Sequence, residues 1–242
     1  MYCSDPETSI AENLVVGQTY YIRVYTYTST PGQTSTFDLC VATPPPPIAT
    51  NNTQYTVPQL VQDVLIGSTC AQISNITWST GTNFGNPNGI AYFTRNGSNF
   101  PLESGIILST GDALKAKGPN TSNLSDGTNS WPGDTQLFNY IQNLGFDPDL
   151  TIYRNATVLE FDFVPITNQL SFDFLFASEE YGTYQCDFSD AFAFFLTDSN
   201  GTTTNLALVP GTSDPISVTR IRDNAYNPGC PSINAQYFDI YN

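Results

Sequence analysis

The chain has 242 residues, of which 22 are acidic and seven are basic, and its formal net charge at pH 7 is −15. A surface of this charge repels polyanions, so we expect no nucleic-acid partner. The chain contains no histidine, which removes the usual general base of serine and cysteine hydrolases, and no apolar stretch approaches the roughly 20 residues of a membrane span.

The first 43 residues contain two segments in which apolar and polar residues alternate, a pattern typical of strands. Residues 14–25 and 36–42 are predicted to pair across a turn rich in Thr, Ser, Pro and Gly. Two strands alone are marginally stable in water, so they need earlier strands or a docking surface on the next module. The segment is similar to the closing strands of fibronectin-like and pre-peptidase-C-like β-sandwiches of exported bacterial proteins. Residues 1–43 are therefore interpreted as the end of a preceding module.

Four consecutive prolines at residues 44–47 follow this pair. A proline run favours an extended polyproline II segment without internal hydrogen bonds, which suits a spacer better than a ligand for a proline-binding domain. Residues 44–54 are predicted to be this linker, and the main module is predicted to span residues 55–242.

The main module is predicted to consist mostly of strands. Residues 60–66 and 134–144 have apolar residues at helical spacing, and Asp134 is a candidate N-cap of the second helix. Strand patterns separated by turn residues occur at 73–78, 89–94, 105–109, 156–163, 169–176, 191–197, 206–210 and 216–221. This succession predicts an all-β fold, an antiparallel β-sandwich or jelly roll of lectin-like type with one or two short helices.

Two neighbouring blocks carry the most specific resemblance of the chain to a known family. Phe174-Leu-Phe-Ala-Ser-Glu-Glu-Tyr181 is followed closely by Ser189-Asp-Ala-Phe-Ala-Phe-Phe-Leu196, and weaker blocks lie at 105–111, 158–165 and 206–212. In this order they resemble the choice-of-anchor L domain, over about residues 55–242. The resemblance implies a secreted, extracellular module of a bacterial cell-surface protein. The family typically continues into further strands, so we expect closing strands to lie outside this sequence or to come from another molecule.

The block Ser189–Leu196 is also similar to a strand of legume-type lectins in which an aspartate lies beside calcium and sugar. Asp190 occupies the aspartate position, but Ala191 stands where those lectins have glycine. This likeness implies a sandwich fold and marks Asp190 as a candidate ligand-binding residue.

The five cysteines are widely spaced and form no Cys-X-X-Cys pair: Cys3, Cys40, Cys70, Cys186 and Cys230. Disulfides of an exported protein fit this spacing better than a zinc ribbon does. One pairing joins Cys3 to Cys40 and Cys186 to Cys230, which leaves Cys70 without a partner in the chain. Five free thiols are the alternative.

An acidic segment joins two strongly apolar stretches of the main module. It contains Glu179, Glu180, Asp187 and Asp190, and loops earlier in the chain supply Asp134 and Asn120. Ca²⁺ takes about six to eight oxygen ligands, and a bound ion would offset the repulsion between these carboxylates. The five acids together are therefore a candidate calcium site. A solvated loop that protects a sheet edge from aggregation explains the same residues.

The acids of this segment do not select a catalytic pair. A glycosidase needs two carboxyl groups about 5 to 10 Å apart that face one cleft. Glu179 and Glu180 are adjacent and point to opposite faces if the chain is extended. A ligand-binding role is considered for Trp131, which lies in a loop by composition, together with Asn120 and Asp190. Burial of Trp131 is the alternative.

These observations favour a non-catalytic adhesion or binding module whose partners are cell-surface glycans or proteins. A structural stalk or filament subunit, assembled with neighbouring modules or with further copies of the chain, is the first alternative. A glycoside hydrolase that draws its acid pair from distant loops is the second.

Overall fold

The computed structural model describes residues 11, 14–15, 17–24, 39, 41, 46–67, 72–118, 120, 122–147 and 149–239. The chain divides into two compact units, Met1–Pro45 and Pro46–Asn242, and each is considered by itself. In the first unit the described residues of 14–24 form no strand ladder. Most of the predicted partner segment, 36–42, lies outside the described residues. The likeness to a pre-peptidase-C-like module therefore stays a prediction.

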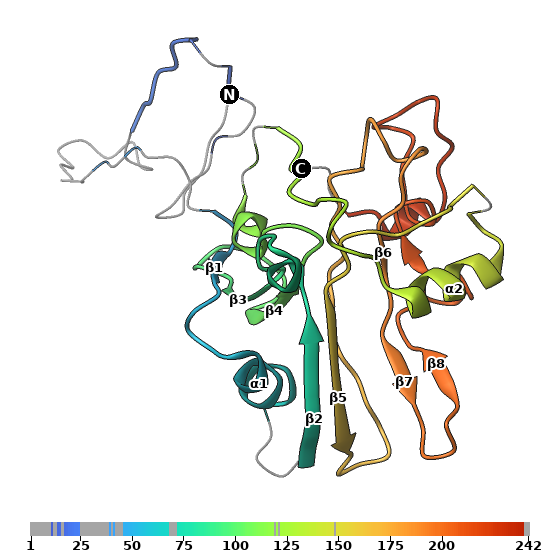
Figure 1. The fold of residues 1–242 in the computed structure, drawn as a ribbon. Coiled ribbons are helices and arrows are strands. Elements are labelled where there is room, and N and C mark those ends of the chain that lie inside the picture. Colours follow the sequence, from blue (N-terminus) through green and yellow to red (C-terminus); the bar gives the residue numbers. More distant parts are fainter. Residues whose placement is uncertain are drawn as a thin grey trace. The chain divides into compact units, whose positions relative to one another are not determined.

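The second unit consists mostly of strands in antiparallel sheets, with a few short helices (Figure 1). The strands are β1 Ala49–Asn51, β2 Gln72–Ser79, β3 Ile90–Thr94, β4 Ser104–Leu108, β5 Val158–Val164, β6 Ala191–Phe192, β7 Phe195–Thr197, β8 Thr203–Asn205 and β9 Ile216–Ser217. The helices are α1 Val57–Gln59, η1 Leu60–Ile66, η2 Gly81–Phe84, η3 Ala113–Lys117, α2 Thr135–Leu144 and η4 Ala235–Tyr237. The predicted all-β class is thus confirmed.

The strands form four antiparallel groups. One is the three-stranded sheet β1-β3-β4, and the others are the pairs β2-β5, β6-β9 and β7-β8. The β2-β5 ladder is interrupted between Ser74 and Thr77, where Asn75 adopts a left-handed φ of 52° and its amide donates to Asp162 Oδ2 at 2.7 Å. Such a bulge bends the strand locally. The four ladders do not establish two packed sheets, so the sandwich stays a prediction.

Four of the predicted strands are found with nearly the expected bounds, as β2, β3, β4 and β5. The predicted strand 191–197 is divided into β6 and β7, because the side chain of Asn205 accepts a hydrogen bond from Phe194 N at 3.0 Å in place of a ladder partner. The predicted strand 216–221 ends at Ser217, where a turn follows, and in 206–210 only Leu208 forms a bridge, to Pro215. Ala49–Asn51, predicted as spacer, forms β1 and pairs with β3.

The prediction of a strand at 169–176 is wrong, because this segment pairs with no other strand of the described residues. Its alternate side chains Phe172 and Phe174 nevertheless pack against Phe194 and Phe192, respectively. In Figure 1 the chain turns after β5 and runs back between β5 and β7. Phe172 stacks on Phe194 with ring centroids 4.3 Å apart, and Phe174 lies 5.2 Å from Phe192. Within the described residues, the backbone of 170–177 makes no hydrogen bond. Aromatic packing rather than strand pairing therefore places this segment.

Both predicted helices are confirmed. Asp134 is the N-cap of α2, since its Oδ1 accepts a hydrogen bond from Leu137 N at 2.7 Å, and the helix ends at Gly145 with a left-handed φ of 67°. Residues 60–66 continue α1 as the π-helix η1. In the part of the chain that the structure describes, no helix is long and apolar enough to cross a membrane.

One cluster of the hydrophobic core lies beside the C-terminal strands. Ala207, Val209, Ile216 and Ile221 are buried together, and the aromatic rings of Phe176, Phe192, Phe194 and Phe238 pack against them. Phe176 and Phe192 of β6 both pack against this cluster. The acidic segment connects them, so both of its ends are held by the core.

Candidate functional site

Glu179 joins the acidic segment to the loop that precedes α2. Its Oε1 accepts a hydrogen bond from Asn120 Nδ2 at 2.6 Å, and its Oε2 accepts one from the Leu124 amide at 3.2 Å. Its backbone carbonyl accepts a third, from Asn123 Nδ2 at 2.7 Å. The predicted proximity of Glu179 and Asn120 is therefore found, and N–H donors occupy both carboxylate oxygens.

Ser178 forms hydrogen bonds with two of the other three acidic residues of the segment. Its hydroxyl donates to Asp190 Oδ2 at 2.7 Å and accepts a hydrogen bond from the Glu180 amide at 3.1 Å. Burial raises the pKa of the Glu180 carboxyl, and the charges of Asp190 and Glu179 raise it further. Glu179 and Asp190 thus lie close enough to Glu180 to disfavour its ionised form.

The remaining acids of the predicted calcium site lie apart from this group. Asp134 uses its Oδ1 to cap α2, and Asp187 is exposed. Within the described ranges, no three His, Cys, Asp or Glu side chains are grouped so that they could hold a metal ion. Both carboxylate oxygens of Glu179 and Oδ2 of Asp190 accept hydrogen bonds from N–H and O–H donors. Calcium binding by these acids stays a prediction from the sequence.

The prediction of Trp131 as a displayed ligand-binding residue is wrong. Its side chain is fully buried, and its indole Nε1 donates to the Ala156 carbonyl at 2.8 Å. The space beside the ring is filled by Gly81, where an added Cβ would lie 2.8 Å from Trp131 Cζ3. The faces of the indole are therefore closed to a sugar ring, and Trp131 packs the core beside η2.

Sequence analysis missed a polar cluster around Asp147. Its Oδ2 accepts hydrogen bonds from Thr219 Oγ1 at 2.9 Å and from Ser189 Oγ at 3.4 Å. Burial raises the pKa of Tyr153, and the charges of Asp147 and Asp190 raise it further. Asp147 directly follows the glycine-ended helix α2, so only the three-dimensional arrangement brings it to Ser189 and Thr219.

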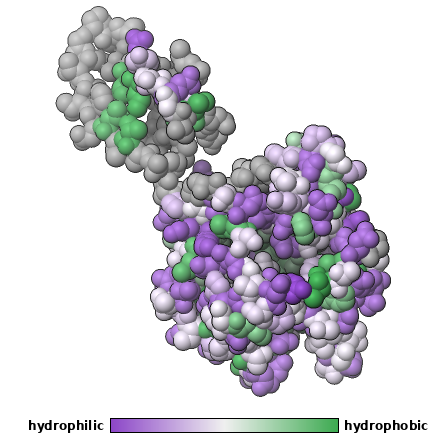
Figure 2. Space-filling view, turned by 45° about the horizontal axis from the view of Figure 1, so that its top comes forward, coloured by the Kyte–Doolittle hydropathy of each residue, from purple (hydrophilic) through white to green (hydrophobic). Residues whose placement is uncertain are grey.

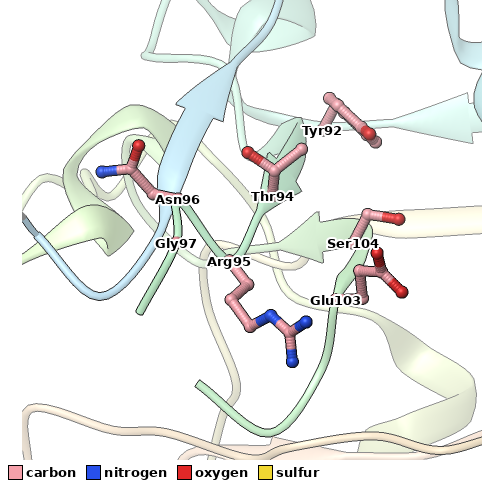
Figure 3. A pocket seen from close by; sticks show the side chains of 7 residues that line it. All are labelled: Tyr92, Thr94, Arg95, Asn96, Gly97, Glu103 and Ser104. Atoms are coloured by element: carbon pink, nitrogen blue, oxygen red, sulfur yellow. The ribbon is translucent and has the colours of Figure 1, made fainter. Parts of the chain in front are cut away.

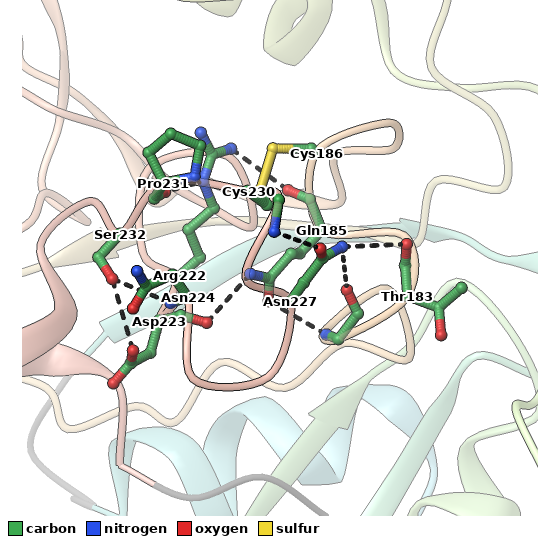
Figure 4. Close-up of a disulfide and its surroundings, with 12 residues drawn as sticks. Thr183, Gln185, Cys186, Arg222, Asp223, Asn224, Asn227, Cys230, Pro231 and Ser232 are labelled. Carbon is green, nitrogen blue, oxygen red and sulfur yellow. Dashed lines mark hydrogen bonds between the residues drawn. A yellow bond between two sulfur atoms is a disulfide. The ribbon is translucent and has the colours of Figure 1, made fainter.

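A disulfide within the acidic segment joins it to a later loop, and Figure 4 shows this bond and its surroundings. Cys186 is bonded to Cys230, which confirms that predicted pair. Cys3, Cys40 and Cys70 lie outside the described residues.

Hydrogen bonds reinforce the loops that this disulfide joins. Gln185 is fully buried, and its amide accepts from the Gly182 N–H at 3.1 Å and donates to the Asp223 carbonyl at 3.0 Å (Figure 4). Arg222 Nε donates to the Pro231 carbonyl at 2.9 Å. The loops at 182–186 and 222–232 are therefore held by both covalent and polar contacts.

Large apolar side chains in and beside these loops are exposed, among them Tyr184, Phe188 and Tyr226. Figure 2 shows one face of the second unit with hydrophilic residues predominant and hydrophobic ones scattered singly or in small groups. Scattered exposed apolar residues are ordinary for a folded protein and by themselves mark no interface.

The sequence profile of the choice-of-anchor L domain matches residues 49–242, which is well over half of the chain and includes β1. No curated protein and no solved structure shows a significant match. Choice-of-anchor L domains are a non-enzymatic family of surface domains, which suggests an extracellular or surface location. The chain belongs to the choice-of-anchor L domain family.

Proposed function

We propose that the chain is a non-catalytic binding module of a secreted bacterial surface protein and that it mediates adhesion to cell-surface glycans or proteins. The observation that carries this proposal is the state of the acidic segment. Both carboxylate oxygens of Glu179 accept hydrogen bonds that tie two loops together, and Asp190 accepts one from Ser178. The side chains of Glu179 and Asp190 are thus engaged in contacts that stiffen this surface.

Rigid loops suit recognition because little conformational entropy is lost when a partner binds. The Cys186–Cys230 disulfide and the buried Gln185 hold the neighbouring loops in the same manner. The polar surface in Figure 2 favours partners that offer hydrogen-bonding groups, such as glycans, over partners that bind through a large apolar patch.

Adhesion is tested with beads that carry the purified full chain, presented to bacterial cells and to a printed glycan array with and without a chelator. We expect saturable binding to some surfaces or glycans, in competition with the free chain. The chelator arm reports whether binding depends on a divalent cation. A chain that binds no surface and no glycan in either condition acts as a passive stalk or assembly subunit and contradicts the proposal.

Catalysis is tested on the same preparation. Incubation with a panel of polysaccharides should release no reducing ends above the level of a heat-unfolded sample. Turnover that is lost in Glu180→Gln would contradict a non-catalytic role, because Glu180 has the raised pKa expected of a general acid.

A further inference from the structure

We propose that a pocket at the turn end of the β3-β4 hairpin binds a sugar unit that bears a carboxylate group, with Arg95 as the residue that recognises the carboxylate. This inference rests on the proposed binding function and adds a site and a ligand class to it. The pocket lies in the β1-β3-β4 sheet, and its lining contains no residue of the acidic segment.

The pocket has a volume of about 440 Å³ and is open to solvent. Figure 3 shows the side chains that line it, all from the facing ends of β3 and β4 and the turn between them: Tyr92, Thr94, Arg95, Asn96, Glu103 and Ser104. Ligand pockets of proteins typically measure about 300 to 1,000 Å³. The space is thus large enough for one sugar ring and leaves the neighbouring rings of a chain in solvent.

The pocket contains one cationic and one anionic side chain, both without a protein partner among the described residues. Arg95 N donates to the Glu103 carbonyl at 2.8 Å, yet neither the guanidinium nor the Glu103 carboxylate makes a hydrogen bond or an ion pair there. Of the four arginines in residues 46–239, the other three donate to protein oxygens: Arg154 to Asn129, Arg220 to Asp214 and Arg222 to Pro231. Arg95 is therefore the guanidinium that this unit leaves for a ligand.

The walls of the pocket are held before any ligand arrives. Thr94 pairs with Ala49 on one side and with Ser104 on the other, so β3 is fixed between two strands. Asn96 and Gly97 take left-handed φ values of 50° and 72°, which closes the turn. The Asn96 amide then donates to the Pro46 carbonyl at 3.3 Å.

The chemistry of the lining matches a carboxylated sugar. A guanidinium binds a carboxylate through two parallel N–H donors, and this fork discriminates an acidic sugar from a neutral one. The hydroxyl groups of a sugar can donate hydrogen bonds to the Glu103 carboxylate. They can donate to or accept from the hydroxyl groups of Thr94 and Ser104. The half-buried Tyr92 ring packs edge-on against Tyr55 at 5.0 Å, which fixes this part of the lining.

The net charge of −15 does not prevent this recognition. At physiological ionic strength charges more than about 8 Å apart are largely screened. The attraction of a ligand carboxylate therefore depends mainly on the charges that lie close to it in the pocket. The Arg95 guanidinium makes no ion pair among the described residues, so its charge is available to a ligand carboxylate. A single carboxylate on a sugar is then attracted at short range, whereas a dense polyanion is repelled by the whole surface.

The test measures binding of methyl glucuronide and methyl glucoside to the full chain by calorimetry or ligand-observed NMR, with acetate as a third probe. We expect the acidic sugar to bind at least tenfold more tightly than the neutral one and than acetate. Arg95→Gln should remove that preference, and Glu103→Gln should keep or increase it, because it removes a negative charge that repels only the acidic sugar. Arg154→Gln is the matched control, because it removes an exposed arginine outside the pocket and should leave both affinities unchanged.

Three outcomes would overturn the inference: equal affinity for the two sugars, a preference that survives Arg95→Gln, or no binding of either sugar. Acetate that binds as tightly as the glucuronide would show a general anion site and would also overturn it. Bead adhesion separates this failure from that of the proposed function. If Arg95→Gln beads still adhere to cells, the module binds through another surface, whereas beads of the native chain that adhere to nothing contradict the proposed function itself.

Discussion

Among single residues, Glu179 makes the contacts whose loss is easiest to measure. Its carboxylate accepts hydrogen bonds from Asn120 and from the Leu124 amide. Glu179→Ala should lower the free energy of unfolding by about 1 to 3 kcal/mol, because it leaves two donors without an acceptor. Denaturant unfolding followed by tryptophan fluorescence measures the change.

The control for this variant is Asp173→Ala, which removes an exposed carboxylate with no partner among the described residues. A surface substitution of this kind should change the free energy of unfolding by less than about 0.5 kcal/mol. Equal effects of the two variants would show that the contacts of Glu179 contribute nothing to stability.

Glu180 should make the folded protein less stable as the pH rises, whereas most acids in proteins have the opposite effect. Its pKa is raised in the folded state by burial and by the charges of Asp190 and Glu179, so the folded chain binds this proton more tightly than the unfolded chain does. The stability that Glu180 contributes is therefore highest when it is protonated and falls as the pH rises above the ordinary value of 4.5 and through the folded-state pKa.

Glu180→Gln should accordingly raise the Tm at pH 7 and leave it nearly unchanged below pH 4.5, where the native carboxyl is protonated in both states. Thermal unfolding of the two proteins across this range measures the difference. A variant that is less stable than the native chain at pH 7 would mean that the ionised Glu180 is favoured in the fold.

At the level of elements, the Cys186–Cys230 disulfide holds two loops that no strand ladder joins. The two cysteines are separated by 44 positions in the sequence. Cross-linking a loop of this length restricts the unfolded chain and should contribute about 4 kcal/mol. The variant with Cys186→Ser and Cys230→Ser should lose about this much in denaturant unfolding. Its stability should not change further with reductant, and a large further loss would assign the stabilisation to other cysteines.

The sequence predicts elements well where local pattern and pairing agree. The strands β2, β3, β4 and β5 combine an alternating pattern with clear turn residues, and α2 has both its Asp134 cap and its terminal glycine in the sequence. The division of β6 from β7 could not be predicted, because it depends on the side chain of Asn205 reaching Phe194 N from another strand.

The candidate site was predicted in part, and for a similar reason. The acidic segment and its proximity to Asn120 could be predicted from the positions of the motifs. Which N–H groups donate to which carboxylate could not be predicted, and the two donors to Glu179 are what give this residue a structural role. Trp131 is buried because a glycine, Gly81, lies against its ring, a long-range contact that composition does not reveal. Arg95 and Glu103 could not be predicted as site residues from the sequence, because each is an isolated charged residue beside a turn and belongs to no motif.

For the whole molecule, the two compact units imply that the second folds without the first. A shortened chain of residues 46–242 retains all of the strand ladders described above, because the ladders lie within Pro46–Asn242. We expect it to unfold cooperatively with a Tm within a few degrees of the corresponding transition in the full chain. Differential scanning calorimetry of both proteins measures this. Loss of a cooperative transition on removal of residues 1–45 would show that the first unit is part of the same fold.

The attachment of the second unit to the chain before it has a mechanical consequence. Tension applied through residue 45 enters the unit at Pro46 and Pro47, whose carbonyls accept hydrogen bonds from Asn96 and Ser98 of the β3-β4 turn, and then at the three-residue strand β1. The turn that lines the Arg95 pocket is thus the first part of the unit to bear a load on that side. If the proposed pocket binds a ligand on another surface, a force between that ligand and the chain before Pro46 would act on the β3-β4 turn itself.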